Sequence, residues 1–171
     1  MRLIGDILSQ LVLACSVPGL PPDIIEAIVI TESSGYVYAV SGSYTNSHYF
    51  LLPDNATETE YAKAVAQASL AHDVNISVGL MQVNSWHIKR MGATIATTID
   101  PCNNILIGSS ILMEIVGRVC PSNYDEECLN AALRQYNTGK TQRSSAGDDY
   151  VFKVRSNVSK LETVEYRTNK H

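Results

Sequence analysis

Residues 21–35 read PPDIIEAIVITESSG, and this stretch decides the fold that the sequence predicts. Pro21 and Pro22 suit the first turn of a helix, because the N–H that proline lacks has no partner inside the helix there. Gly35 suits its end, because helices commonly stop at a glycine in the left-handed conformation. Apolar residues recur between them at helical spacing. We therefore predict a helix over residues 21–35.

Glu32 lies at the end of the apolar face of this predicted helix. Ile25 and Ile28 lie seven and four residues before it, so the carboxyl group extends the stripe that faces the core. A carboxyl group partly removed from water favours its neutral form, which raises its pKa. A general acid that works near neutral pH needs such a pKa. The stretch alone leaves a second interpretation open, in which the last turn frays and Glu32 points into water.

Length and composition limit the classes of protein to which the chain can belong. Its 171 residues fit one domain with a substantial core, and 45% hydrophobic against 18% charged residues is typical of a globular protein. The formal net charge of −4 argues against nucleic acid or an anionic membrane as the main partner. No apolar run approaches the roughly 20 residues that span a bilayer.

The cysteines number four, Cys15, Cys102, Cys120 and Cys128, and neither they nor the scattered histidines show the spacing of a zinc site. We therefore expect no metal and no other cofactor. Two interpretations of the cysteines stay open: buried free thiols, or two disulfides formed in an oxidising compartment. Cys120 and Cys128 flank a polar loop that a short bridge would close. Cys15 and Cys102 would then remain as the other pair.

The first residues also admit two interpretations. Residues 1–15 superficially resemble a secretion signal or a lipid-attachment signal, but polar residues at 5–6 and 9–10 interrupt the apolar region that such a signal needs. The apolar residues instead follow the period of a helix, which favours an amphipathic first helix. On that interpretation, any signal peptide has been removed from the sequence.

The rest of the chain predicts a small β lobe followed by several helices. Residues 36–40 and 48–52 favour strands, so we expect a hairpin there, and Thr57 with Glu60 forms the pattern of a capping box that begins a helix over residues 57–72. Small residues at 108–110 predict close packing of their helix against a neighbour. Residues 73–77 are predicted to be a loop; the further helices are predicted over residues 86–91, 102–119 and 125–136, with a last one from 148 and a polar, partly disordered tail after 155.

Three separated segments carry a resemblance to a known family. They are ESSG at residues 32–35, GLMQVN at residues 79–84 and AALRQYNTG at residues 131–139. In this order and at these separations they resemble the lytic transglycosylases that have a goose-type lysozyme-like fold. The segment DPCNN at residues 100–104 further resembles the specialised members that accompany type IV secretion and conjugation systems, as does the position of Cys15 before the proline-opened helix. The resemblance covers about residues 10–155; each segment is weak alone, and the ordered set is specific.

The resemblance implies that Glu32 is the catalytic residue. In such enzymes the glutamate protonates the glycosidic oxygen between N-acetylmuramic acid and N-acetylglucosamine in peptidoglycan. Its carboxylate then removes a proton from the C6 hydroxyl of the muramic acid, which closes on C1 and leaves a 1,6-anhydromuramyl end without consuming water. The N-acetyl group of the substrate can stabilise the cationic centre, so the second carboxylate that most glycosidases use is not needed.

The resemblance also implies a set of substrate-binding residues. Gly79 would let the backbone approach the glycan, Gln82 would offer an amide that donates and accepts, and Met81 would line the groove. Taken singly, a core Met and a Gln bound to backbone are the simpler interpretations. The full implied set is Ser34, Gly79, Leu80, Met81, Gln82, Asn84, Tyr136 and Asn137, with the phenol of Tyr136 facing Glu32.

Asp73 leaves the type of reaction open. It lies six residues before Gly79, where goose-type lysozymes carry an aspartate thought to help position a water. With Asp73 in the cleft, the same fold would support hydrolysis by a muramidase. A solvated loop acid is the interpretation that we favour. Trp86 and several tyrosines could stack on sugar rings, although most of them are expected to serve packing.

The sequence thus predicts a mainly α, lysozyme-like domain over residues 1–155 with a small β-hairpin lobe beside the cleft, and a polar tail over residues 156–171. We expect a monomeric periplasmic or secreted enzyme that acts on peptidoglycan strands and binds no nucleic acid. The resemblance implies an envelope-spanning secretion machine as a further partner, and it favours two disulfides because such enzymes are exported. A non-catalytic peptidoglycan-docking factor is the rival from a different class, and Glu32 argues against it because a pure binder needs no such acid.

Overall fold

The structure is a computed structural model that describes residues 1–42, 75–121 and 125–168, with isolated positions between residues 57 and 66. The predicted helices over residues 21–35, 102–119 and 125–136 are confirmed to within two residues at each end. The elements are α1 (Asp6–Cys15), α2 (Pro22–Ser33), β1 (Val40–Gly42), β2 (Ile76–Val78), β3 (Val83–Asn84), α4 (Ser85–Arg90), α5 (Ile95–Thr98), α6 (Pro101–Val119), α7 (Glu126–Thr138) and α8 (Ser145–Thr168).

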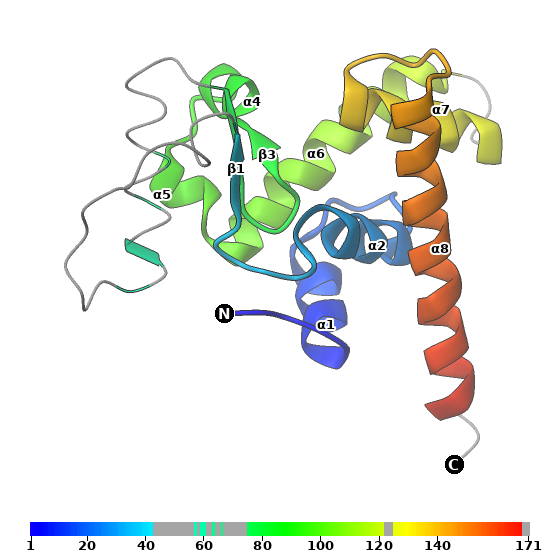
Figure 1. Ribbon diagram of the computed structural model, residues 1–171, viewed down its shortest axis with the longest axis horizontal. Coiled ribbons are helices and arrows are strands. Elements are labelled where there is room, and N and C mark those ends of the chain that lie inside the picture. Colours follow the sequence, from blue (N-terminus) through cyan, green and yellow to red (C-terminus); the bar gives the residue numbers. More distant parts are fainter. Residues whose placement is uncertain are drawn as a thin grey trace.

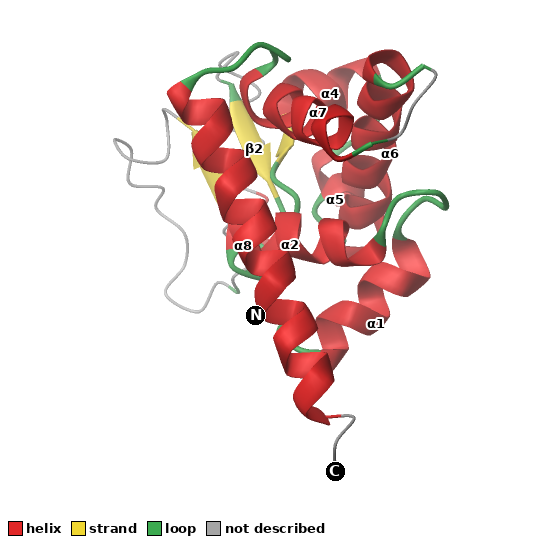
Figure 2. Cartoon of the chain, turned by 90° about the vertical axis from the view of Figure 1, so that its right-hand side faces the viewer, coloured by secondary structure: helices red, strands yellow, loops and turns green. Residues whose placement is uncertain are grey.

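Helix α2 lies at the centre of the fold. Helices α1 and α8 pack against it, and α6 packs against α1, α5 and α7. Figure 1 shows the small sheet with α4 and α5 on one side of α6, and α7 and α8 on the other. Figure 2 shows α8 running past α2, with its last turns extending beyond the other helices. The predicted mainly α fold with a small β lobe is confirmed.

The sequence of α2 explains where the helix begins and ends. Pro22 is its first residue, and the side chains of Ile25 and Ile28 are fully buried against its neighbours. The helix ends in two left-handed residues, because φ is 53° at Ser34 and 80° at Gly35, whereas the sequence predicted that conformation for Gly35 alone.

The amino-terminal segment packs against the residues that follow α2. The N–H of Leu3 donates to the carbonyl of Gly35 (2.8 Å), and Nε of Arg2 donates to the carbonyl of Ser34 (2.7 Å). A Cβ at position 35 would overlap the carbonyl of Leu3, so this contact requires glycine there. The predicted amphipathic first helix is confirmed as α1, with Leu8 and Val12 buried.

The β lobe differs from the predicted hairpin. The sheet is antiparallel in the order β1–β2–β3, with Val40 opposite Val78 and Val78 opposite Val83. Part of the predicted loop over residues 73–77 is therefore strand β2, while the predicted strand over residues 48–52 lies outside the described residues. Ile76 and Val78 are buried and flank a half-buried Ser77. This alternation is too short to predict a strand by itself.

Two further helix predictions change in extent. Helix α8 begins at Ser145 and continues to Thr168, so the tail that was expected to be partly disordered is helical as far as Thr168. Of the helix predicted over residues 57–72, most lies outside the described residues. Its capping box is present, because Thr57 N–H donates to Oε2 of Glu60 (2.8 Å) and Glu60 N–H donates to Oγ1 of Thr57 (3.3 Å).

Two disulfides connect the helices. Cys15 pairs with Cys102 and ties the end of α1 to the start of α6, while Cys120 pairs with Cys128 and ties the end of α6 to α7. The interpretation as free thiols is therefore excluded. Among the described residues, we find no helix with the length and apolar character that crossing a membrane requires.

Candidate active site

Glu32 lies in the last turn of α2 and lines a cleft of about 420 Å³. The phenol of Tyr150 on α8 donates a hydrogen bond to Oε1 of Glu32 (2.7 Å). Burial raises the pKa of the Glu32 carboxyl group, and the hydrogen bond from Tyr150 opposes part of that rise. The structure thus agrees with the partly buried carboxyl group predicted from the sequence, and the frayed turn with Glu32 in water is excluded.

Tyr150 is held by the packing of α8 on α7. Arg134 of α7 is only 4% exposed, and it pairs with Asp148 (2.8 Å), two residues before Tyr150, and with Glu127 (3.0 Å). This buried guanidinium fixes the start of α8 and hence the phenol that reaches Glu32. Burial, followed by the charge of Glu32, raises the pKa of Tyr150 well above its usual value, so the phenol remains a hydrogen-bond donor at neutral pH.

Tyr136 of α7 is the second phenol near Glu32. Burial of its hydroxyl raises its pKa well above the usual value, and the charge of Glu32 adds to the rise. The hydrogen bond of the phenol, however, goes to the carbonyl of Met81 (2.9 Å), so Tyr136 ties α7 to the turn between β2 and β3.

Asn104 of α6 holds that turn from below the cleft. Its side chain is fully buried, Oδ1 accepts from the N–H of Met81 (2.7 Å), and Nδ2 donates to the carbonyls of Val78 (2.9 Å) and Thr98 (2.8 Å). At Gly79 φ is 79°, and a Cβ there would lie 2.9 Å from Oδ1 of Asn104 and closer to the rest of the amide. Glycine is therefore required at this position by the packing of Asn104, not by the approach of a ligand.

Three residues of the implied binding set are buried under the cleft instead of lining it. Gly79 is buried, and the side chains of Leu80 and Met81 are both 0% exposed. Met81 packs so closely on Gly108 of α6 that a Cβ there would overlap it, which also confirms the close packing predicted for residues 108–110. Met81 is thus a core residue and does not line the groove. Ser34 is exposed but lies outside the lining of the cleft.

Gln82 lines the cleft, but most of its amide is already bonded. Nε2 donates to the carbonyls of Gly79 (3.0 Å) and Ala39 (3.2 Å), and Oε1 accepts from the hydroxyl of Ser41 (2.5 Å). An amide nitrogen carries two hydrogens, so toward a ligand Gln82 offers only the remaining acceptor capacity of Oε1. The interpretation of a glutamine bound to backbone was therefore correct for its donors.

The cleft brings five predicted residues together: Glu32, Gln82, Asn84, Tyr136 and Asn137. The side chain of Asn84 accepts from the N–H of Trp86 (3.0 Å) and so caps α4. Asn137 is exposed and makes no side-chain hydrogen bond with the described residues, which leaves its amide for a ligand. The sequence did not predict the lining residues Ser41, Asn75, Ser77, Val83, His87, Ile111, Ile115, Gln135, Thr138 and Gly139.

The chemistry of the lining is that of one acid among neutral polar groups. Glu32 is the single carboxyl group among the described residues of the cleft, and most of the others carry amides or hydroxyls. Asp73 lies outside the described residues, so its role stays a prediction. Within the described ranges, no group of three or more His, Cys, Asp or Glu side chains could hold a metal ion. The arrangement suits proton transfer to a neutral ligand rich in oxygen and amide groups.

Comparison with known proteins gives a family match over most of the chain. Residues 14–157 match the family described as the Transglycosylase SLT domain. The match includes Glu32, the turn over residues 79–82, and both tyrosines that lie near Glu32. No solved structure gives a significant match to the chain.

Several curated relatives are similar over much of the sequence. The type IV secretion system protein VirB1 of Brucella abortus biovar 1 (strain 9-941) is 32% identical over 143 residues, which cover 80% of this chain and 58% of VirB1. The invasion protein IagB of Salmonella typhimurium (strain SL1344) is 34% identical over 121 residues, which cover 61% of this chain and 69% of IagB. Protein VirB1 of Agrobacterium fabrum (strain C58) is 26% identical over 145 residues, with 84% and 56% covered. The chain therefore spans little more than half the length of the VirB1 proteins.

Proposed function

The chain belongs to the Transglycosylase SLT domain family, and on that premise we propose that it is a peptidoglycan lytic transglycosylase. It cleaves the β-1,4 bond between N-acetylmuramic acid and N-acetylglucosamine without water and leaves 1,6-anhydromuramyl ends. One observation carries the proposal. Glu32, whose pKa is raised by burial, is the single carboxyl group among the described residues of a cleft lined by neutral amides and hydroxyls.

The contacts of Glu32 support both halves of this reaction. In the first half, the neutral carboxyl group donates its proton to the glycosidic oxygen, and burial raises the pKa of Glu32 and so favours this protonated form. As the bond breaks, the N-acetyl group of the muramic acid stabilises the cationic C1. In the second half, the carboxylate takes the proton of the C6 hydroxyl while this oxygen bonds to C1. Tyr150 stabilises the transient carboxylate through its hydrogen bond to Oε1.

We propose that the enzyme acts outside the cytoplasm and opens the cell wall locally for a secretion or conjugation apparatus. Two disulfides support an oxidising compartment. The similarity to VirB1, which is named as a type IV secretion system protein, supports the connection to such an apparatus. The similarity to IagB, named as an invasion protein, is compatible with a related task.

Mass spectrometry of the fragments released from purified sacculi tests the reaction. The proposal expects muropeptides with anhydromuramyl ends, each one water lighter than the corresponding lysozyme product. Glu32→Gln keeps the size of the side chain and its ability to accept from Tyr150, but its amide has no acidic proton to transfer to the glycosidic oxygen. Release by this variant should fall by about 10²–10⁴-fold, the usual contribution of general acid–base catalysis. Asp73→Asn is the paired variant and should cost far less.

Other products would point to the alternatives. Fragments that end mainly in reducing sugars would overturn the transglycosylase proposal in favour of a muramidase, and loss of activity in Asp73→Asn would then support water as the nucleophile. Binding of the protein to sacculi without release of any fragments would favour the non-catalytic docking factor. Should Glu32→Gln keep most of the activity while Asp73→Asn abolishes it, the assignment of the acid would be wrong.

A further inference from the structure

A second hollow continues the cleft past α4. It has a volume of about 370 Å³, and it shares lining residues with the cleft, among them Trp86 and His87 of α4 and Ile111 and Ile115 of α6. We call it the outer pocket and define it by the three residues that line it but not the cleft, Arg90, Glu114 and Arg118. Because the two hollows share several lining residues, the outer pocket lies directly beside the cleft.

The chemistry of the lining changes where the cleft meets the outer pocket. The cleft holds amides and hydroxyls around Glu32, whereas the outer pocket holds two guanidinium groups and one carboxylate. The outer pocket therefore has an excess of one positive charge in a chain whose formal net charge is −4. His87 adds no charge at neutral pH, because burial and then the neighbouring Arg90 lower its pKa below the usual value. Such a pocket favours an anion.

The two arginines differ in what binds them. The guanidinium of Arg90 pairs with Glu114 (2.7 Å) and lies over the ring of Trp86 (5.5 Å to its centroid). These contacts hold the guanidinium in place, and Glu114 compensates its charge. Arg118 is exposed, and it makes no hydrogen bond or ion pair with any described residue. Arg118 is therefore the cation of the outer pocket that is left for a ligand.

The position of Arg118 on α6 determines how far a ligand must extend from the cleft to contact it. Ile111 lines both hollows and lies seven residues before Arg118 on α6, which corresponds to about 10 Å at 1.5 Å per residue. An extended peptide of three residues spans about the same distance. In peptidoglycan the lactyl carboxyl group of each muramic acid is amide-bonded to a short peptide, so the free carboxylates of a peptide-bearing strand are those of its peptides.

We propose that the outer pocket binds the carboxylates of such a stem peptide, with Arg118 as the main ligand, while the sugar that bears the peptide lies in the cleft. The inference rests on the proposed function. Guanidinium groups bind carboxylates in a bidentate manner, and such charge-assisted hydrogen bonds are about twice as strong as neutral ones. The enzyme then prefers strands that still carry peptides over strands from which the peptides have been removed.

Calorimetric binding to the Glu32→Gln protein tests the pocket apart from catalysis. The two probes are a disaccharide of N-acetylglucosamine and N-acetylmuramic acid with a stem peptide, and the same disaccharide with its lactyl group as a neutral methyl amide in place of the peptide. We expect the peptide-bearing probe to bind about 10-fold more tightly, as a hydrogen bond between charged groups allows. Adding Arg118→Gln should remove this difference and leave the affinity for the peptide-free disaccharide unchanged. The preference should also shrink as salt screens the charges.

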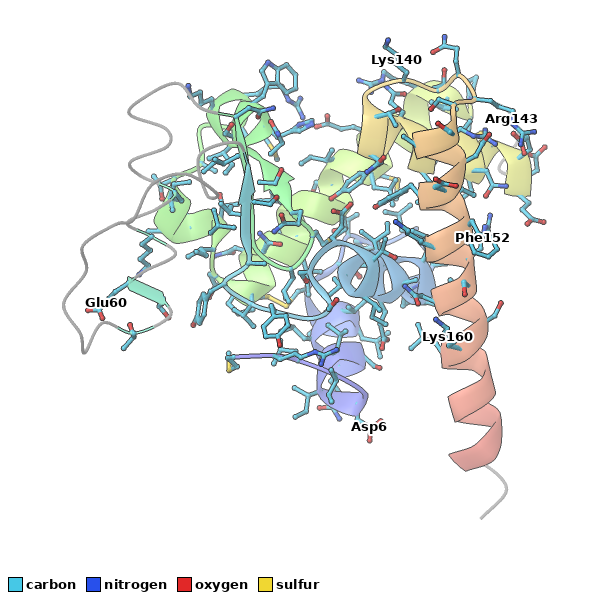
Figure 3. The ribbon with its side chains drawn as sticks, viewed as in Figure 1. Asp6, Glu60, Lys140, Arg143, Phe152 and Lys160 are labelled. Atoms are coloured by element: carbon cyan, nitrogen blue, oxygen red, sulfur yellow. A yellow bond between two sulfur atoms is a disulfide. The ribbon has the colours of Figure 1, made fainter. Side chains whose placement is uncertain are left out.

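Lys160→Gln is the matched control, because it removes one positive charge from an exposed side chain on the lower part of α8 (Figure 3) and should leave both affinities unchanged. Equal affinity for the two probes would overturn the proposal, and so would a preference for the peptide that survives Arg118→Gln. Failure of the proposed function has a different signature, namely sacculi that yield no anhydromuramyl ends. In that case the affinities for the two probes still test the outer pocket, because they do not depend on catalysis.

Discussion

Gly79→Ala tests whether Asn104 holds the turn under the cleft. The added methyl group would lie 2.9 Å from Oδ1 of Asn104 and closer to the rest of the amide, which is buried and bonded to three backbone groups. Asn104 cannot move away without losing those bonds. The variant therefore adds one methyl group to a closely packed part of the core that cannot rearrange to make room for it.

Two costs add up at this position. A residue with a Cβ in the left-handed region, where φ is 79° at Gly79, costs about 1–2 kcal/mol. Overpacking a well-filled site costs about a further 1–3 kcal/mol. The free energy of unfolding should therefore fall by about 2–5 kcal/mol, which is a large share of the roughly 5–15 kcal/mol that stabilises most domains.

Gly139→Ala isolates the two costs. Its φ of 76° is nearly the same, but apart from the glycine and its chain neighbours no described residue has a heavy atom within 4 Å of the added Cβ, so only the backbone cost of about 1–2 kcal/mol should remain. Urea denaturation of both variants measures the difference. Equal losses of stability in the two variants would refute the packing argument and show that Gly79 is required by its backbone conformation alone.

Three further predictions concern Glu32, Tyr150 and the disulfides. Burial raises the folded-state pKa of Glu32, so the stability linked to its protonation is complete below the unfolded-state pKa and is lost as pH rises through the folded-state pKa. Glu32→Gln removes that loss and should raise the melting temperature at neutral and alkaline pH but not in acid; an equal shift at all pH values would contradict this. Tyr150→Phe removes the hydrogen bond that lowers the pKa of Glu32, so the alkaline limb of the pH profile of kcat/KM should move to higher pH, and a shift to lower pH would argue against the contact. Replacing Cys15 and Cys102 by serine should lower the free energy of unfolding by about 4–5 kcal/mol, because that disulfide joins residues 87 positions apart. Replacing Cys120 and Cys128, which are 8 positions apart, should lower it by about 2–3 kcal/mol. Denaturation curves of the two double variants that showed the reverse order would be inconsistent with the loop-entropy argument.

The parts of the fold that could be predicted from the sequence are those that local chemistry determines. Helix α2 has prolines at its start and an apolar face with an interval of three to four residues, and both signals are contained within the helix itself. The partner of strand β1 could not be predicted in the same way. Its hydrogen bonds go to Ile76–Val78, more than thirty residues further along the chain, and a strand of three residues has too few positions for its alternation to be recognised.

In the candidate site, too, the features that depend on local sequence could be predicted, and those that depend on distant segments could not. The buried position of the Glu32 carboxyl group could be predicted, because this group continues an apolar stripe within its own helix. Tyr150 could not, because its role depends on α8 crossing α2 at a point 118 residues away in sequence. The sequence left the position of Met81 between groove and core, because an apolar residue in a turn fits both equally well until Gly108 and Asn104 are placed beneath it.

Asn104 is a polar residue among the apolar neighbours of α6. It lies next to Ile105 and one helical turn before Gly108, and all three residues are buried. A buried amide in such a place must bond to something, since an unpaired polar group in a core costs about 1–3 kcal/mol. The same reasoning applies to Arg134 beside Leu133 on α7, where the buried guanidinium binds Asp148. In both helices the polar residue among apolar neighbours predicts that a buried partner exists, but only the fold identifies the partner, and in both cases that partner belongs to the segment that positions a group at the cleft.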